Sequence, residues 1–246
     1  MGLAPRTQFV ARGDGHIAYQ VYGNGPAQLL LVTGLASNLD MTWQFPMSTA
    51  WFERLAQLGQ VAPYDLRGYG MSDRLPEEYG VEDMAADALA VADAAGFEQP
   101  TIWADATGAA TAVWLAVHTP ERVRSLVIEN GSVCRRWHPD YEIGLRDDVV
   151  AERRDGFRAM WGTGFSMALF APSHLGDERL AEEWARYETS AATPTAALAG
   201  FDLAFSLDVR ALLPEVTQPT FVYHSLSNGL IPAAQGRYIA EHIPNA

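Results

Sequence analysis

Short apolar runs alternate with longer helical patterns along most of the chain, and this alternation constrains the fold more than any other feature. The run at 28–32, which reads QLLLV, is typical of a strand that is buried on both faces. Strands that alternate with helices build a mostly parallel sheet with helices on both faces. The sequence therefore predicts an α/β fold with a doubly wound sheet. We expect strands at 8–12, 16–22, 28–32, 60–64, 101–104, 123–129 and 219–224, and helices at 50–58, 81–95, 107–118 and 233–242.

The alternation stops between about residues 133 and 205, where helical periodicity continues without a strand and aromatic residues are frequent. Aromatic side chains outside the main core need another place to be buried, so we interpret residues 134–205 as a helical cap over one end of the sheet. Residues 1–133 and 206–246 then form the core. The candidates for lining a pocket under the cap are Trp137, Tyr141, Trp161 and Phe165. The alternative is that these aromatics only pack helices together.

The charged residues exclude several classes of function. All 17 basic residues are arginines, and a chain without lysine has no group for a Schiff base, a pyridoxal phosphate linkage or a P-loop. Thirty acidic residues outnumber the 17 arginines and give a formal net charge of −13, which disfavours nucleic acid and anionic membranes as partners. Residues 1–10 lack an apolar signal core and no run of about 18 apolar residues follows, which predicts a cytoplasmic protein.

Metals and cofactors are not expected either. The single cysteine, Cys134, cannot form an internal disulfide. Neither it nor the six histidines show CxxC or HExxH spacing, so we expect no metal site. No cofactor motif is present, and a small hydrophobic molecule is the expected partner.

The segment at 65–74, DLRGYGMSDR, follows an expected strand and resembles the DxRGxGxS loop of α/β-hydrolases. Further similarity to these proteins, at 33–34, 104–108 and 119–127, extends the resemblance over essentially the whole chain. The stretches 34–43, 184–187 and 235–238 are similar to actinobacterial α/β-hydrolase domains, some of which are fused to nucleotide-cyclase or regulator domains; these residues contain no such partner. The resemblance implies the α/β-hydrolase fold with an inserted cap, with the last strand and helix of that fold absent from these residues.

The resemblance places the nucleophilic serine of a hydrolase at Ala106. In α/β-hydrolases this serine lies on a sharp turn between a strand and a helix, where crowding tolerates only small neighbours. Alanine has no oxygen to attack a carbonyl carbon, so acyl-enzyme chemistry is excluded at this position. A shift of one residue would make Asp105 the nucleophile, as in epoxide hydrolases and haloalkane dehalogenases. Trp103 would then stand where a small residue is needed.

The acid and base positions depart from the family pattern as well. The acid is expected in a pattern like HGxxDxxVP, and the segment 224–232 places Asn228 there. An amide cannot stabilise an imidazolium as a carboxylate does. Glu129, at the end of an expected strand, is an alternative acid position, although we favour the simpler interpretation that it only caps the strand end. The family's histidine follows one further strand, which would lie beyond Ala246, and we interpret the six histidines present as structural.

An oxyanion hole made of backbone N–H groups survives side-chain substitution, and the resemblance assigns its donors to Leu35 and Thr107. Two interpretations remain. The first is a pseudo-hydrolase that binds a small hydrophobic carbonyl or carboxylate compound. The second is a serine hydrolase in a Ser-to-Ala, C-terminally truncated form. A lyase or isomerase in the same pocket would need a base that the sequence does not show.

The strand expected at 220–223, TFVY, carries no charge and no proline. In α/β-hydrolases an eighth strand pairs with this one. Without that strand its backbone groups are a template for pairing with another chain. We therefore expect self-association through 220–223.

Overall fold

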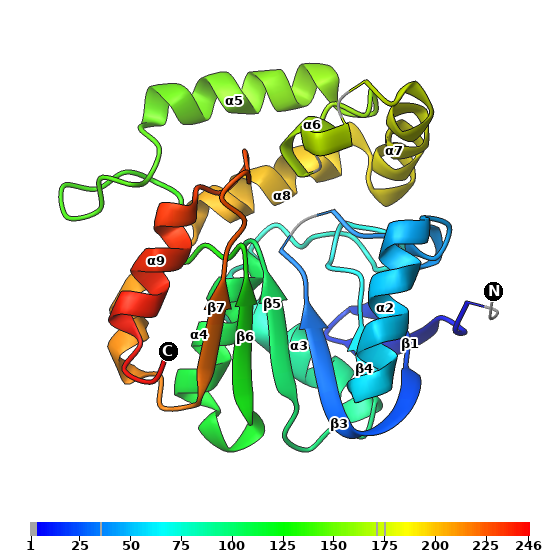
Figure 1. Cartoon of the computed structure of the whole chain (residues 1–246), viewed down its shortest axis with the longest axis vertical. Helices are drawn as coiled ribbons and strands as arrows, with labels where there is room; N and C mark the ends of the chain where they lie inside the picture. Colours follow the sequence, from blue (N-terminus) through cyan, green and yellow to red (C-terminus); the bar gives the residue numbers. More distant parts are fainter. Residues whose placement is uncertain (1–3, 35, 171, 175) are drawn as a thin grey trace.

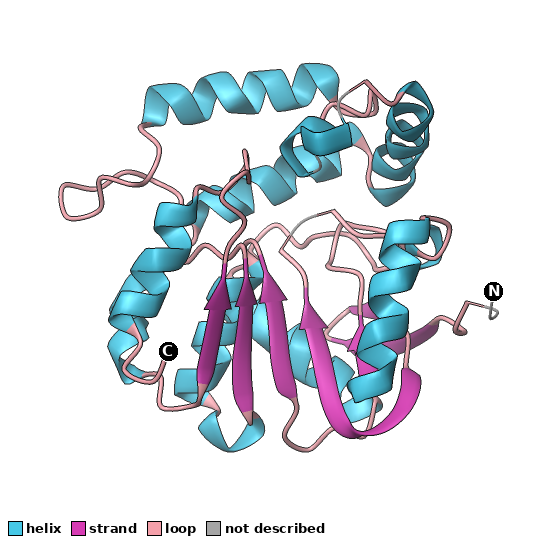
Figure 2. Ribbon diagram, in the orientation of Figure 1, coloured by secondary structure: helices cyan, strands magenta, loops and turns pink. Residues whose placement is uncertain are grey.

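The protein is described by a computed structural model that covers residues 4–34, 36–170, 172–174 and 176–246. A five-stranded sheet forms its centre, and every neighbouring pair of strands is parallel, in the order β4-β3-β5-β6-β7 (Figures 1 and 2). The predicted mostly parallel α/β sheet is thus confirmed. The strands are β3 (Tyr22–Val32), β4 (Gly59–Pro63), β5 (Thr101–Asp105), β6 (Ser125–Glu129) and β7 (Thr220–Tyr223), with β1 (Gln8–Arg12) and β2 (Gly15–Tyr19) paired as a separate antiparallel hairpin.

Both faces of β3 are buried, as its apolar run predicts. Successive side chains of a strand point to opposite faces of the sheet. Leu30 and Val32 accordingly join the larger core cluster, while Leu29 and Leu31 pack with Phe52 of α2 (Pro46–Leu58) in a second cluster on the other face. Burial on both faces explains why this strand lacks an alternating polar pattern.

The larger cluster lies between the sheet and the helices α3 (Val81–Ala94) and α4 (Gly108–His118). Ala109, Ala112 and Ala116 of α4 are fully buried, and their small side chains bring the helix close to the strands. The remaining elements outside 134–205 are α1 (Leu39–Thr42), α9 (Ala233–His242) and short 3-10 turns at Pro120–Arg122 and Arg210–Glu215.

The described part of residues 134–205 contains helices and no strand of the sheet. These helices, which we call the upper helices, lie above the carboxyl ends of the strands (Figure 1). In open α/β sheets, ligands bind at this end of the strands. The upper helices are α5 (Asp147–Met160), α6 (Met167–Phe170), α7 (Glu178–Ala191) and α8 (Pro194–Ser206), with a 3-10 turn at Pro172–His174.

A buried carboxylate holds the upper helices together. Glu188 of α7 accepts backbone hydrogen bonds from Gly162 and Gly164 at 2.9 and 2.8 Å, and from Ser166 at 3.1 Å. The hydroxyl of Ser166 donates to the same carboxylate. Several donors around one acid compensate for its burial, so the turn between α5 and α6 is fixed to α7.

The loop that resembles DxRGxGxS is fixed by its own polar side chains. Asp65 accepts the backbone N–H groups of Leu39 and Met71 at 3.1 and 3.0 Å, and burial raises the pKa of its carboxyl to about 6. Arg67 donates to the buried Asp87 at 2.9 Å. Ser72 donates to the Asp65 carbonyl oxygen and accepts from the backbone of β2, so its hydroxyl has a structural role.

No helix in the described ranges is long and apolar enough to cross a lipid bilayer.

Candidate active site

The turn between β5 and α4 has a strained backbone at Ala106, whose φ is +44°. This left-handed conformation costs a residue with a Cβ about 1–2 kcal/mol. Its neighbours must be small because the backbones are close: a Cβ on Gly34 would lie 2.1 Å from the Thr107 nitrogen, and one on Gly108 would lie 2.0 Å from the Val32 oxygen. The positive φ is at Ala106 and not at Asp105, so the shifted register with Asp105 on the turn is not the one that the chain adopts.

Backbone hydrogen bonds hold this turn against β6. The Ala106 N–H donates to the Glu129 carbonyl oxygen at 3.3 Å, and the Ala106 carbonyl oxygen accepts from the Ser132 N–H at 2.9 Å. The side chain of Ala106 is 4% exposed. The methyl group therefore has a fixed position at the end of β5.

A cavity of about 1070 Å³ lies between this turn and the upper helices. Ala106 and Asp105 are part of its floor, and most of its lining is apolar. A volume of this size accommodates a small organic ligand. Its aromatic lining residues are Trp51, Phe52, Tyr64, Tyr69, Phe157, Trp161, Phe165, Trp184, Tyr187, Phe201 and Phe205.

A sequence model described as the alpha/beta hydrolase fold matches residues 28–246. The chain belongs to the α/β-hydrolase fold family. The predicted resemblance to this superfamily is therefore confirmed, and the β5–α4 turn is the position at which the family carries its nucleophile.

Several named hydrolases are similar to this family member over most of its length. The putative carbamate hydrolase RutD of Azorhizobium caulinodans is 28% identical, over 95% of this chain and 85% of the relative. The 2-hydroxymuconate semialdehyde hydrolase of Pseudomonas putida is 30% identical, over 98% of this chain and 80% of the relative. Among solved structures, an esterase from Exiguobacterium antarcticum has a TM-score of 0.83 at 21% identity, covering 98% of this chain and 88% of that one, which supports the fold.

Asn228, which the sequence predicts at the acid position, lines the cavity. Its amide oxygen accepts the backbone N–H groups of Leu230 and Ile231 at 2.9 and 2.8 Å. The oxygen is thus engaged in folding its own loop. A residue of this kind is a turn former, which is a common role of Asn.

Glu129, the predicted alternative acid, also lines the cavity. Its carboxylate accepts the indole N–H of Trp103 at 3.0 Å. Burial raises the pKa of Tyr223, and its hydrogen bond to Glu129 adds to the effect. Glu129 is therefore held by side chains of the two neighbouring strands.

Asp105 brings a second carboxyl group to the cavity floor. It accepts the Gly34 N–H at 2.8 Å. Burial raises its pKa from 3.8 to about 7, the Gly34 hydrogen bond opposes this rise, and the nearby charge of Glu129 adds to it. Asp105 is thus partly protonated at neutral pH, a property that its sequence position alone does not show.

The structure places two of the four predicted cap aromatics in the cavity wall, Trp161 and Phe165. Trp137 and Tyr141 lie outside it. The Arg146 guanidinium covers the Trp137 ring at 4.7 Å, and the Tyr141 hydroxyl contacts the Cys134 carbonyl oxygen at 3.2 Å. Both residues precede α5, in the connection that leads from β6 to α5 (Figure 1).

Of the two predicted oxyanion donors, the structure describes only Thr107. Leu35 lies outside the described residues. Within the described ranges, the backbone N–H of Thr107 has no hydrogen-bond acceptor. Thr107 lines a second, small cavity together with Leu66 and Tyr69.

None of the described residues that line the large cavity is a histidine. The Nε2 of His224 donates to the Ile231 carbonyl oxygen at 2.7 Å, and His118 stacks on Trp114 with ring centroids 4.2 Å apart. These two imidazoles have structural partners.

Arg135 is a charged residue in the cavity wall that no sequence motif indicates. It is 5% exposed, its guanidinium lies 4.5 Å from the Phe205 ring centroid, and it donates to the Leu230 carbonyl oxygen at 3.1 Å. Among the residues that the structure describes, no carboxylate forms an ion pair with it. Burial, together with the like charge of Arg153, lowers its pKa to about 10, so it remains charged at neutral pH. Nothing in the local sequence distinguishes Arg135 from the adjacent Arg136.

Proposed function

We propose that this protein binds a small, mostly apolar carboxylate or carbonyl compound in the large cavity, and that it does so without serine chemistry. The observation that carries the proposal is the methyl group of Ala106, held at the strained turn where the family has its nucleophile. The turn, the cavity and the floor remain, but the attacking oxygen is absent. In this proposal residues 134–205 act as the cap over the ligand.

Arg135 supports a carboxylate as the polar end of the ligand. A buried guanidinium without a carboxylate partner is costly, and a bound carboxylate would supply the missing charge-assisted hydrogen bonds. The aromatic wall fits the apolar part. The relatives are named for carbamate, enol-lactone and ester compounds, all of which carry a carbonyl group.

The first experiment compares phenylacetate with phenylacetamide as probes, using quenching of tryptophan fluorescence because Trp51, Trp161 and Trp184 line the cavity. Phenylacetate is expected to bind more tightly than the amide. The Arg135→Met variant should lose at least tenfold of its affinity for the acid and little for the amide. Arg124→Gln, an exposed site away from the cavity, is the control. Equal binding of the acid by Arg135→Met and the native protein would refute the carboxylate assignment.

The second experiment tests the absence of serine chemistry. A fluorophosphonate probe should not label the protein, and p-nitrophenyl acetate should hydrolyse only at the slow rate that a binding site without a nucleophile gives. Labelling of any serine together with ester turnover would overturn the proposal.

The second candidate is hydrolysis of a similar compound by a form of this protein that carries serine at position 106. The names of the relatives favour it. It would require a base, and the described cavity lining holds no histidine. Ester turnover that appears in Ala106→Ser, and rises further in the double variant with Asn228→Asp, would support it.

A further inference from the structure

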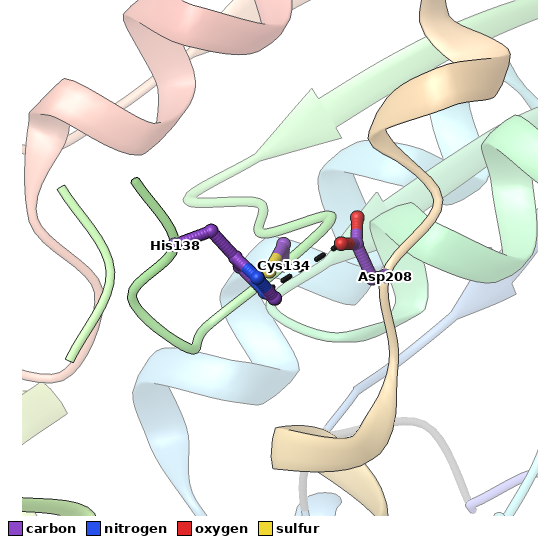
Figure 3. A group of neighbouring side chains, drawn as sticks. All are labelled: Cys134, His138 and Asp208. Atoms are coloured by element: carbon purple, nitrogen blue, oxygen red, sulfur yellow. Dashed lines mark ion pairs between the residues drawn. The ribbon is translucent and has the colours of Figure 1, made fainter. Parts of the chain in front are cut away.

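Three side chains with different donor atoms meet outside the large cavity: Cys134, His138 and Asp208 (Figure 3). Their sulfur, nitrogen and oxygen atoms all lie within 4.8 Å of one another. His138 Nε2 is 3.7 Å from Asp208 Oδ2. Cys134 and His138 precede the upper helices, whereas Asp208 follows α8, so the cluster joins two segments that are far apart in the chain.

Backbone pairing brings these residues together. Cys134 and Asp208 face each other in an antiparallel bridge, which the hydrogen bond from the Val209 N–H to the Val133 carbonyl oxygen supports at 3.0 Å. His138 pairs in the same way with Tyr141. The donor atoms are therefore brought close together by two paired stretches of backbone.

Arg210 orients the carboxylate of the cluster. It donates from Nε to Asp208 Oδ1 at 2.9 Å and from Nη2 to Oδ2 at 2.8 Å, and its Nη1 donates to Asp140 at 3.1 Å. Carboxylates that bind metals are commonly held by such outer hydrogen bonds. The positive charge of Arg210 opposes a cation, but the two carboxylates on either side of it offset that charge.

We propose that Cys134, His138 and Asp208 form a zinc site. Zinc accepts sulfur, imidazole and carboxylate donors together, whereas magnesium and calcium prefer oxygen donors only. With metal–donor distances of about 2.0–2.3 Å, tetrahedral donors lie roughly 3.3–3.8 Å apart, so the cluster must contract by about 1 Å. Three protein donors leave the fourth position to a water molecule, and the thiol releases its proton to solvent when the metal binds.

The site would connect the segment that leads into the upper helices to the segment that leaves them. A metal at this point restrains both connections, so it should stabilise the position of these helices over the cavity. The CxxC and HExxH patterns detect only donors that are close in sequence. They could not detect a donor set that spans residues 134 to 208.

Cobalt(II) is the probe for the ligand set, because its bond to a thiolate gives a charge-transfer absorbance and Cys134 is the only cysteine. The native protein should bind one equivalent with this absorbance, and zinc should displace the cobalt. Zinc should also raise the melting temperature. Cys134→Ser should abolish the absorbance, and His138→Gln and Asp208→Asn should each weaken zinc binding at least tenfold. His242→Gln, at the end of α9, is the matched control and should bind like the native protein.

Absence of stoichiometric cobalt and zinc binding would overturn the proposal. The proposal would also be overturned if His138→Gln bound zinc with native affinity, because the imidazole would then not be a ligand. Circular dichroism of each variant identifies any loss of fold. His138→Gln is the decisive variant because 37% of the His138 side chain is exposed, whereas Cys134 is buried, so this substitution disturbs the packing less.

Discussion

The raised pKa of Asp105 makes the stability of the protein depend on pH in a way that one substitution should remove. In the folded protein burial places this pKa at about 7, against 3.8 in the unfolded chain. At pH values between these two pKa values, the Asp105 carboxyl is ionised in the unfolded chain and protonated in the folded protein. The free energy of unfolding therefore falls as pH rises through this window, and the loss is complete above about pH 8.

The size of the effect follows from the two pKa values. One pKa unit corresponds to about 1.36 kcal/mol, and integration from pH 5 to pH 8 gives about 2.6 kcal/mol. Solvent in the cavity screens part of this electrostatic penalty, so we expect the free energy of unfolding to change by about 2 kcal/mol. Asp105→Asn keeps an oxygen that can accept the Gly34 N–H but carries no charge. The free energy of unfolding of Asp105→Asn, minus that of the native protein, should therefore rise by about 2 kcal/mol between pH 5 and pH 8.

Urea unfolding followed by circular dichroism at pH 5, 6, 7 and 8 measures this difference. Subtracting the free energies of unfolding of the two proteins at each pH cancels the contributions of titrating groups that both proteins contain. Glu98→Gln, which removes an exposed carboxylate, is the matched control. A difference between Asp105→Asn and the native protein that stays constant from pH 5 to pH 8 would show that Asp105 is not buried in the way described.

Three further outcomes are expected. Ala106→Ser alone should raise the hydrolysis of p-nitrophenyl acetate less than tenfold, because a serine without base or acid is a weak nucleophile; turnover well above that would reveal a base near the cavity. Gly156→Ala should raise the free energy of unfolding by about 0.5–1 kcal/mol in urea titrations, because the glycine is inside α5 and a Cβ there meets no atom within 4 Å. Sedimentation should show self-association through the edge strand β7, where Phe221 is 63% exposed, and Phe221→Lys should yield a monomer; a native monomer at about a hundred micromolar would contradict this.

Local patterns in the sequence determined the elements of the core. The helix predicted at 233–242 has the same bounds in the structure, and the strand predicted at 101–104 is one residue longer. The run at 28–32 contains the buried part, residues 29–32, of a strand that begins at residue 22. These predictions succeed because side chains of a strand or helix repeat with a fixed period, so neighbouring residues carry the signal.

The turn at Ala106 was predictable for the same reason, since it depends on a few adjacent small residues. The cavity wall was not. Trp161 and Tyr141 are both aromatic residues of the same segment, yet only Trp161 faces the cavity. The direction in which each points depends on how the upper helices pack, which no local pattern encodes.

Charge and ligand geometry were decided by tertiary structure alone. The pKa of Asp105 depends on its burial beside Glu129. The guanidinium of Arg135 is placed in the cavity wall against the ring of Phe205, a residue of α8. Cys134 reaches Asp208 only because the chain leaves the sheet and returns to it at the same place. The sequence by itself determined the main elements of the core and the alanine at position 106 of the turn. Only the packing of distant segments decided which charges and donor atoms meet, because such contacts depend on the whole path of the chain.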